Sequence, residues 1–168
     1  QVESKVQSSR LFAELTERAN SRIQVPRQFV TSTVEDAAAL LARNSKNDQP
    51  SVIKSEFGVG GFGARTILPH EIGSEADALD TWRALANEDN IFGNRMLIVE
   101  DYIRGRSVKR DLTVDLVVDQ EVEIKCVGEM LVEGTKYGGV NIGPHAVPEV
   151  EATAMREFGV LVGEAIMA

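Results

Sequence analysis

The residues best suited to chemistry lie in one short stretch, where an apolar strand is followed by a glycine-rich loop. Lys54 ends the predicted strand, and the loop that follows it contains Gly58, Gly60, Gly61, Phe62 and Gly63. Glycines leave main-chain N–H groups unshielded, so such a loop can wrap phosphate oxygens. A lysine ammonium supplies a compact positive charge for the same anion. The stretch therefore predicts a phosphate-binding loop. The alternative is a flexible hairpin turn, although a tight turn needs fewer glycines.

The order of the elements around this loop excludes three known phosphate-binding motifs. The dinucleotide fingerprint G-x-G-x-x-G leads into a helix, whereas residues 64–68 have the pattern of a strand and Pro69 follows them. A P-loop needs a Gly-Lys-Ser/Thr sequence, which does not follow here. A protein kinase places its strand lysine after the loop, but Lys54 precedes it, and the motifs His-Arg-Asp and Asp-Phe-Gly do not occur.

Apolar periodicity predicts the elements that position the loop. Strands grouped with intervening helices indicate an α+β fold of two small lobes. Glycine-rich residues 129–147 are expected to be irregular, and a turn is expected at Asp119-Gln120. Ser32 and Glu35 match a capping box at the start of the second helix. The expected helices are residues 2–19, 33–44, a third that begins after Ser74 and buries Ala78, Trp82 and Leu85, and a last one from about Val150; the expected strands are residues 27–30, 51–55, 64–68, 96–99, 112–118 and 122–127.

Composition limits the partners of the chain. A formal net charge of −8 argues against nucleic acid as the main partner, since phosphate backbones attract clustered Lys and Arg. The short basic stretch Arg104–Arg110 predicts a local phosphate contact instead. The single cysteine, Cys126, excludes an internal disulfide, and its place in an alternating strand predicts a small core residue. No apolar run reaches the roughly 20 residues that span a membrane. Without a visible signal peptide, we expect a cytoplasmic protein.

Several motifs, taken in order, resemble those of the ATP-grasp superfamily. The resemblance is to its carboxylate–amine and thiol ligases, with a pattern related to carbamoyl-phosphate synthase and biotin carboxylase. The motifs are Pro50-Ser-Val-Ile-Lys54 before the glycine loop, Lys5 in the first helix, Val25-Pro26, Val99-Glu-Asp-Tyr-Ile103 as a hinge, Asp111-Leu-Thr-Val-Asp115, and Gly134-Thr-Lys-Tyr-Gly-Gly139 followed by Pro144.

This resemblance implies a domain plan and a set of ATP contacts. Residues 1–25 form a leading helix and connector, residues 26–94 the lid lobe, and residues 95–168 the first part of a second lobe, with ATP between the lobes. Lysines neutralise phosphate, the hinge main chain at Asp101 and Ile103 binds adenine, and Ile53 and Ile103 flank its ring. The expected ATP-binding residues are Lys5, Lys54, Gly58, Gly60, Gly61, Phe62, Gly63, Glu100, Asp101, Tyr102, Ile103 and Asp111.

Each of these assignments has a plainer alternative. Lys5 and Lys54 also fit lysines that face water, the hinge strand also fits ordinary core, and Asp111 also fits a solvated carboxylate. Glu100 is assigned to the adenine amino group, and Asp111 to the ribose hydroxyls.

The resemblance also implies a function: an ATP-dependent ligase that forms an acyl phosphate from a carboxylate, which an amine or another nucleophile then attacks. Mg²⁺ is expected in the full-length protein, with its carboxylate ligands on strands after the last helix, so no metal ligand is assigned here. Because the chain begins at Gln1 and lacks a helix stop signal at its end, we expect a piece of a longer protein that is inactive by itself. The alternative is a non-catalytic nucleotide-binding or interaction module.

Overall fold

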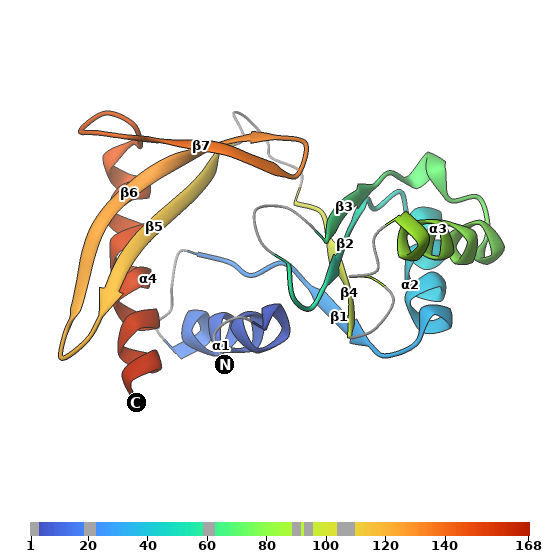
Figure 1. Ribbon diagram of the computed structural model, residues 1–168, viewed down its shortest axis with the longest axis horizontal. Coiled ribbons are helices and arrows are strands. Elements are labelled where there is room, and N and C mark those ends of the chain that lie inside the picture. Colours follow the sequence, from blue (N-terminus) through green and yellow to red (C-terminus); the bar gives the residue numbers. More distant parts are fainter. Residues whose placement is uncertain (1–3, 19–22, 59–62, 89–91, 93–95, 104–109) are drawn as a thin grey trace. The chain divides into compact units, whose positions relative to one another are not determined.

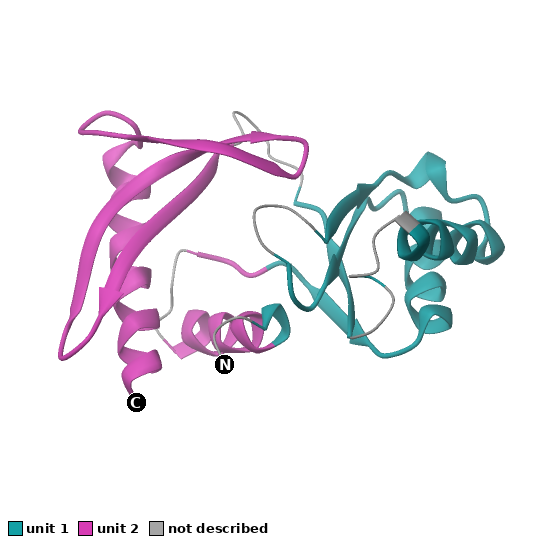
Figure 2. Ribbon diagram, in the orientation of Figure 1, with its two compact units in different colours: residues 1, 3–6, 26–104 teal, residues 2, 7–25, 105–168 magenta. Residues whose placement is uncertain are grey.

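The structure of the chain is a computed structural model, which describes residues 4–18, 23–58, 63–88, 92, 96–103 and 110–168 (Figure 1). The chain divides into two compact units, coloured separately in Figure 2. Unit 1 comprises residues 1, 3–6 and 26–104, and unit 2 comprises residues 2, 7–25 and 105–168. The first helix, α1 (Lys5–Arg18), is divided after Val6. Among the described helices, none has the length and apolar character needed to cross a membrane.

Unit 1 is built on a four-stranded antiparallel sheet in the order β1-β4-β2-β3. β4 has a neighbour on each side, so this apolar strand lies inside the sheet. β2 and β3 are paired neighbours joined through the glycine loop, so the predicted strand–loop–strand order is also confirmed. The strands are β1 (Gln28–Thr31), β2 (Ser51–Ser55), β3 (Ala64–Ile67) and β4 (Leu97–Asp101).

Two helices, α2 (Val34–Lys46) and α3 (Glu75–Glu88), contribute to the hydrophobic core of unit 1 together with the sheet. Burial alternates along β2, so Ile53 joins this core while Lys54 lies on the other face. The ring of Trp82 is 1% exposed and meets Phe92 edge to face, with ring centroids 6.1 Å apart. The inward face predicted for the third helix, with Ala78, Trp82 and Leu85, is confirmed. A short 3₁₀ turn, η1 (Pro69–Glu71), precedes α3.

The N-terminal cap of α2 is Thr33, so the capping box predicted at Ser32 and Glu35 was wrong by one residue. The Thr33 hydroxyl accepts a hydrogen bond from the main-chain N–H of Asp36 at 3.2 Å, and it donates to the Asp36 carboxylate at 2.7 Å. Two hydroxyl residues stand side by side here, and an acidic residue follows each of them three positions later. The pattern therefore occurs twice in the sequence, and the structure uses the second occurrence.

Unit 2 is a three-stranded antiparallel meander, β5-β6-β7, packed against the long helix α4 (Figure 1). The turn predicted at Asp119-Gln120 is confirmed, since it lies between β5 and β6. The prediction that residues 129–147 are irregular was wrong, because β6 continues to Glu133 and turns at Gly134 into β7. The elements are β5 (Asp111–Val118), β6 (Val122–Glu133), β7 (Lys136–Ile142) and α4 (Glu149–Met167).

Glycines let α4 lie close to the sheet of unit 2. A Cβ atom at Gly163 would lie 2.6 Å from Cγ1 of Val122, and one at Gly159 would lie 3.1 Å from Cδ1 of Ile124. In the same unit, the ring of Phe12 in α1 contacts the ring of Phe158 in α4, and the two ring centroids lie 5.7 Å apart. The meander and the helix thus form a closely packed layer pair.

The boundary predicted between residues 94 and 95 requires one correction. We expected residues 95–168 to begin the second lobe, but β4 pairs with β1 and β2 and belongs to unit 1, which extends to residue 104. The apolar sequence of residues 96–99 does not indicate which sheet the strand belongs to. Its partner β1 lies about seventy residues earlier in the chain, as the hydrogen bond between Gln28 and Glu100 shows.

Candidate functional site

Lys54 is held by an ion pair with Glu100. Its ammonium Nζ lies 2.7 Å from Oε1 of Glu100, and the two side chains are 26% and 12% exposed. The antiparallel register pairs Val52 with Glu100, which places Glu100 on the same face of the sheet as Lys54. Gln28 on β1 donates to the other carboxylate oxygen of Glu100 at 3.1 Å. Three strands thus fix one lysine and one carboxylate on the face opposite the core.

Lys5, at the start of α1, belongs to the same unit and reaches the beginning of the glycine loop. Its Nζ donates to the main-chain carbonyl of Gly58 at 2.7 Å, and its main-chain N–H donates to the carbonyl of Glu56 at 3.1 Å. Ser4 donates its hydroxyl to the Glu56 carboxylate at 2.7 Å. Burial, and then the nearby charge of Lys54, lower the pKa of Lys5 below its ordinary value of 10.5. The two lysines therefore interact electrostatically, as a shared phosphate site requires.

The glycine loop is described only at its two ends. Gly63 has a φ of 70°, a left-handed conformation that favours glycine, and its carbonyl accepts from the N–H of Ser55 at 2.8 Å. The Ser55 hydroxyl donates to the carbonyl of Phe57 at 3.0 Å. The predicted ligands Gly60, Gly61 and Phe62 lie outside the described residues.

The hinge segment after β4 is fixed by main-chain bonds. The N–H of Asp101 donates to the carbonyl of Arg27 at 2.9 Å, and the N–H of Tyr102 donates to the carbonyl of Pro50 at 3.0 Å. The carbonyl of Tyr102 accepts from the side chain of Gln49 at 3.2 Å. The main-chain N–H of Asp101 therefore already has an acceptor within unit 1.

The apolar residues expected on either side of adenine have different environments. Ile53 is fully buried in the core, so its predicted contact with a ring is wrong: the strand alternation directs it towards the helices. Val52, its neighbour, is half-buried and faces the same side as Lys54. Ile103 is 59% exposed, which leaves its side chain accessible to a ligand.

Asp111, the predicted ribose ligand, belongs to unit 2. It begins β5 opposite Met130 of β6 and is half-buried. The structure brings together Lys5, Lys54, Glu100 and both ends of the glycine loop, all in unit 1. The contact of Asp111 with a ribose stays a prediction.

Sequence reasoning missed four residues that position this site. Ser4 and Glu56 hold the start of α1, while Gln28 and Asn44 bind the carboxylates of the hinge strand. Asn44 is buried, and its amide donates to Ser51 at 3.0 Å and to Asp101 at 3.3 Å. Of these four residues, only Asn44 could have been noticed in the sequence, because it is a polar residue on the apolar face of a predicted helix.

The basic stretch is only partly described, since Arg104, Arg106 and Lys109 fall outside the described residues. Arg110 is paired within unit 2, with Nη1 3.2 Å from Glu151 and Nε 3.9 Å from Glu129. Its charge is therefore balanced by neighbouring carboxylates, which weakens its predicted role as a phosphate contact.

Cys126 is half-buried and does not belong to the core, so that prediction was wrong. Its thiol donates to the Asp115 carboxylate at 3.5 Å, and partial burial together with this carboxylate raises the pKa of the thiol. The irregularity between Asp115 and Leu116 shifts the strand register next to it. A bulge of this kind cannot be read from an alternating pattern.

Comparison with known proteins gives one family match and several structural matches. Residues 9–133 match the model of the family described as carbamoyl-phosphate synthase L chain, ATP binding domain. No curated protein matches the chain.

Three solved structures illustrate the structural likeness. The D-alanyl-alanine synthetase A of Vibrio cholerae O1 biovar eltor has a TM-score of 0.67 at 13% identity, over 98% of this chain and 47% of that one. An ADP complex of N5-carboxyaminoimidazole ribonucleotide synthetase has a TM-score of 0.67 at 18% identity, over 98% and 38%. The phosphoribosylamine–glycine ligase of Thermotoga maritima has a TM-score of 0.58 at 18% identity, over 99% and 41%. The chain thus spans less than half the length of these structures.

Proposed function

The chain belongs to the family of carbamoyl-phosphate synthase L chain ATP-binding domains, and from this premise we propose that unit 1 binds ATP through Lys5, Lys54 and the glycine loop. The ATP-grasp relationship predicted from the motifs is confirmed, and so is the α+β fold. One structure with the same fold contains ADP. What remains to be argued is how the residues of this chain would hold the nucleotide.

The observation that carries the proposal is the pair of lysines beside the loop. Two ammonium groups in one partly buried place repel each other, which is why the charge of Lys54 lowers the pKa of Lys5. A bound polyphosphate would relieve this repulsion, and it would accept hydrogen bonds from the ammonium groups and from the loop N–H groups. Lys5 now donates to the carbonyl of Gly58, and Lys54 to Glu100. These contacts hold both lysines in position before a ligand arrives.

The hinge segment supplies a site for the base. Adenine needs one main-chain acceptor and one main-chain donor, and we assign the carbonyl of Asp101 and the N–H of Ile103. Tyr102 lies between them with its N–H and carbonyl bound to Pro50 and Gln49, so the segment is held rigid. Glu100 accepts from the adenine amino group in the same proposal, while Val52 and Ile103 contact the ring.

The activity of the whole protein is a further part of the proposal. The names of the similar structures include ligases and synthetases, so we assign this chain to an ATP-dependent carboxylate–amine ligase. ATP would convert the carboxylate to an acyl phosphate, and the amine would displace the phosphate. The lysines of unit 1 would act by positioning the triphosphate and balancing its charge.

Mg²⁺ is implied by the family likeness, and we propose that the full-length protein binds it. Nowhere in the described part of the chain do three His, Cys, Asp or Glu side chains gather around one point. No metal ligand is assigned among the residues above, and the metal stays a prediction for the full-length protein.

Calorimetric titration with ATP tests the nucleotide site. Replacement Lys54→Met removes one phosphate-binding charge while keeping the stem of the side chain, and should weaken ATP binding by about tenfold or more. The matched control is Lys46→Met, which removes an exposed lysine from the last turn of α2 in the same unit and should leave affinity unchanged. Equal affinity in both variants would refute the assignment of Lys54. Binding without turnover in the full-length protein would support the non-catalytic alternative.

A further inference from the structure

β1 is an edge strand of the unit 1 sheet. The N–H of Asp101 bonds to the carbonyl of Arg27, and bonded pairs alternate along an antiparallel ladder. In the register of β1 with β4, Phe29 and Thr31 therefore direct their main-chain groups towards β4. Gln28 and Val30 direct theirs to the outer edge, where no strand pairs with them among the described residues. Such an edge is a template for another strand.

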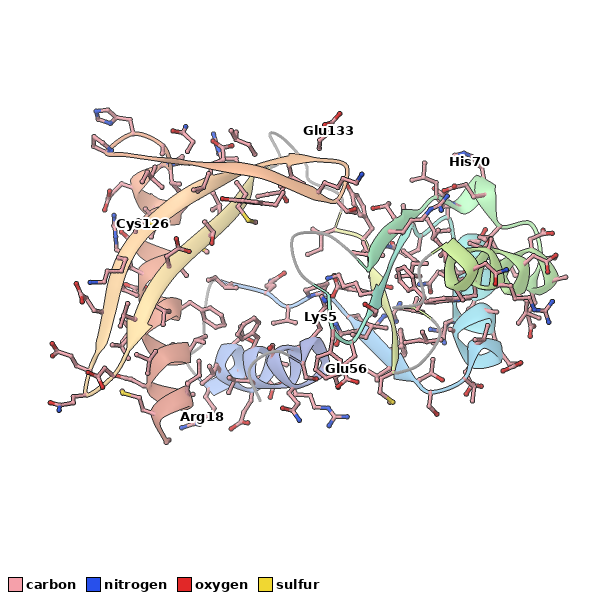
Figure 3. All side chains as sticks on the ribbon, viewed as in Figure 1. Lys5, Arg18, Glu56, His70, Cys126 and Glu133 are labelled. Atoms are coloured by element: carbon pink, nitrogen blue, oxygen red, sulfur yellow. The ribbon has the colours of Figure 1, made fainter. Side chains whose placement is uncertain are left out.

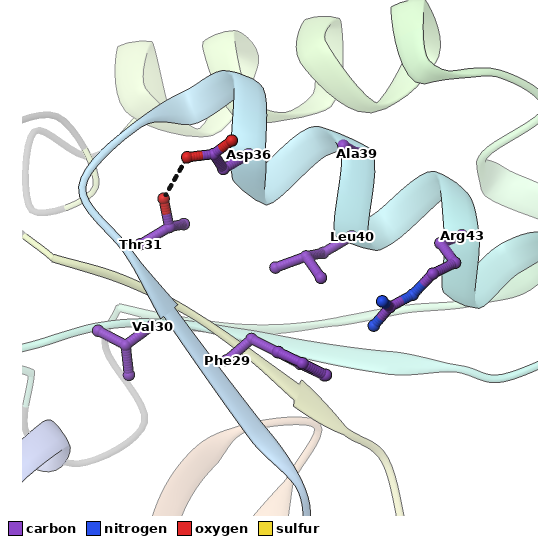
Figure 4. Close-up of a pocket in the computed structure, with 7 residues that line it drawn as sticks. All are labelled: Phe29, Val30, Thr31, Asp36, Ala39, Leu40 and Arg43. Atoms are coloured by element: carbon purple, nitrogen blue, oxygen red, sulfur yellow. Dashed lines mark hydrogen bonds between the residues drawn. The ribbon is translucent and has the colours of Figure 1, made fainter.

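Beside this edge, β1 and α2 enclose an open groove of about 430 Å³ (Figure 4). Its wall on the helix is a single stripe, formed by Asp36, Ala39, Leu40 and Arg43. These positions are i, i+3, i+4 and i+7, so they share one face of α2. Leu40 is half-buried and the other three are exposed. The centre of the stripe is apolar, and its two ends carry opposite charges.

The charges at the two ends are held by the strand. At one end the Asp36 carboxylate accepts from the hydroxyls of Thr31, at 3.3 Å, and Thr33, at 2.7 Å (Figure 4 shows the first). At the other end the guanidinium of Arg43 lies over the ring of Phe29, 5.0 Å from its centroid. Within the described residues, Arg43 makes no ion pair. The negative end thus lies beside Thr31, and the positive end beside Phe29.

We propose that this face binds a second copy of the chain, with β1 of each copy paired antiparallel about a twofold axis at Val30. The two Val30 residues exchange their outward N–H and carbonyl groups, and Phe29 of one copy lies opposite Thr31 of its partner. The helix stripes then run antiparallel, so Arg43 of each copy meets Asp36 of the other, with the apolar residues between. An isologous interface requires this self-complementarity.

The charges select this register over its neighbour. Another symmetric pairing that uses the outward groups places the axis at Phe29, so Gln28 pairs with Val30 of the partner. That register brings the two Arg43 side chains together around a pair of Phe29 rings, and like charges directly opposed are destabilising. A peptide strand of another protein would gain the main-chain bonds, but it would not match the ordered charges on the helix. The sequence of the stripe therefore favours a second copy.

Sedimentation velocity over a range of concentrations, up to about 100 μM, tests the proposal with reversed charges. Asp36→Arg and Arg43→Asp should each weaken the dimer about tenfold or more, because each creates two repulsive pairs across the axis. The double variant restores two attractive pairs and should return to within about threefold of the original affinity. Circular dichroism and thermal melting of every variant establish that α2 is still folded. A chain that stays monomeric, or a dimer that the swaps do not change, would overturn the proposal.

Disulfide trapping tests the register independently. In a Cys126→Ser background, Val30→Cys places one cysteine of each copy at the axis, directly opposite the other. Their Cα atoms would lie about 5.5 Å apart, a distance that a disulfide can span. Mild oxidation should give a covalent dimer. The control Gln28→Cys lies two residues from the axis, opposite Ser32 of the partner, and should give far less. Equal trapping of both variants, or none with Val30→Cys, would contradict this interface.

Discussion

The ammonium of Lys54 and the carboxylate of Glu100 lie 2.7 Å apart on neighbouring antiparallel strands, with both side chains largely withdrawn from water. The pair holds the lysine side chain on the face of the sheet where we place ATP. Because both groups are partly buried, neither can lose its partner without leaving a charge poorly solvated.

Glu100→Gln should therefore lower the free energy of unfolding by about 1–3 kcal/mol, as expected for a partly buried charge that loses its partner. Lys54→Met combined with Glu100→Gln removes both charges and should cost less than the sum of the single changes. Urea denaturation of the original chain, the two single variants and the double variant measures the coupling energy between Lys54 and Glu100. Disrupting the exposed pair of Arg83 and Asp80, whose side chains are 66% and 76% exposed, serves as the control and should have little effect. Strict additivity at Lys54 and Glu100 would contradict this account.

Lys5 should give the nucleotide site a pH dependence. Its pKa is lowered by burial and by Lys54, so the folded chain loses this proton at a lower pH than the unfolded chain does. Between the lowered pKa and 10.5, the unfolded state therefore binds more protons than the folded state. The contribution of Lys5 to the free energy of unfolding rises with pH across this window. Bound phosphate favours the charged lysine, so ATP binding should take up protons at alkaline pH. Calorimetry in buffers of different ionisation enthalpy measures this uptake, and Lys5→Met should abolish it.

Amide exchange should report the contact between the loop and the phosphates. We expect residues 57–64 to exchange rapidly without nucleotide and to gain protection when Mg-ATP is added, because phosphate oxygens would accept from the loop N–H groups. The amides of β4 should be protected in both states, since this strand has a neighbour on each side. A loop that is already protected without nucleotide would mean that the glycines serve packing.

The two glycines of α4 should differ in their tolerance of alanine. Gly163→Ala places a Cβ 2.6 Å from Cγ1 and 2.7 Å from Cγ2 of Val122, a branched side chain with little freedom. We expect a loss of about 1–3 kcal/mol from overpacking, larger than the roughly 1 kcal/mol by which alanine favours a helix. Gly159→Ala meets the end of Ile124 at 3.1 Å and should cost less. Thermal melting of both variants tests this order.

Local sequence signals predicted much of unit 1. The strand that ends at Lys54, the glycine loop and the strand that follows it are contiguous, and their order together with missing sequence motifs excluded the competing phosphate sites. The inward face of α3 followed from the spacing of Ala78, Trp82 and Leu85. Such features are visible because periodicity and turn residues act over a few positions.

Features that depend on distant pairing could not be predicted. Nothing in residues 28–31 reveals that they pair with residues 97–100, so the role of Gln28 beside Glu100 was missed and β4 was assigned to the wrong lobe. The same limit applies to Ile53, whose direction depends on which face of the sheet the helices cover. In the turn after β6 and in β7, glycines at 134, 138 and 139 suggested a loop, although the hairpin pairing of these two strands tolerates them.

The pairing of β4 with β1 and β2 also has a consequence for biosynthesis. Unit 2 joins β5, β6 and β7 in chain order, so its sheet forms from contacts between sequence neighbours and should assemble quickly. In unit 1, β1 and β2 are not hydrogen-bonded to each other, and both pair with β4, the last strand of this sheet to be synthesised. Until residues 97–101 emerge, both strands remain without the element that joins them, and their edges are open to wrong partners. We therefore expect the nascent chain to be prone to aggregation in the interval before its central strand is made.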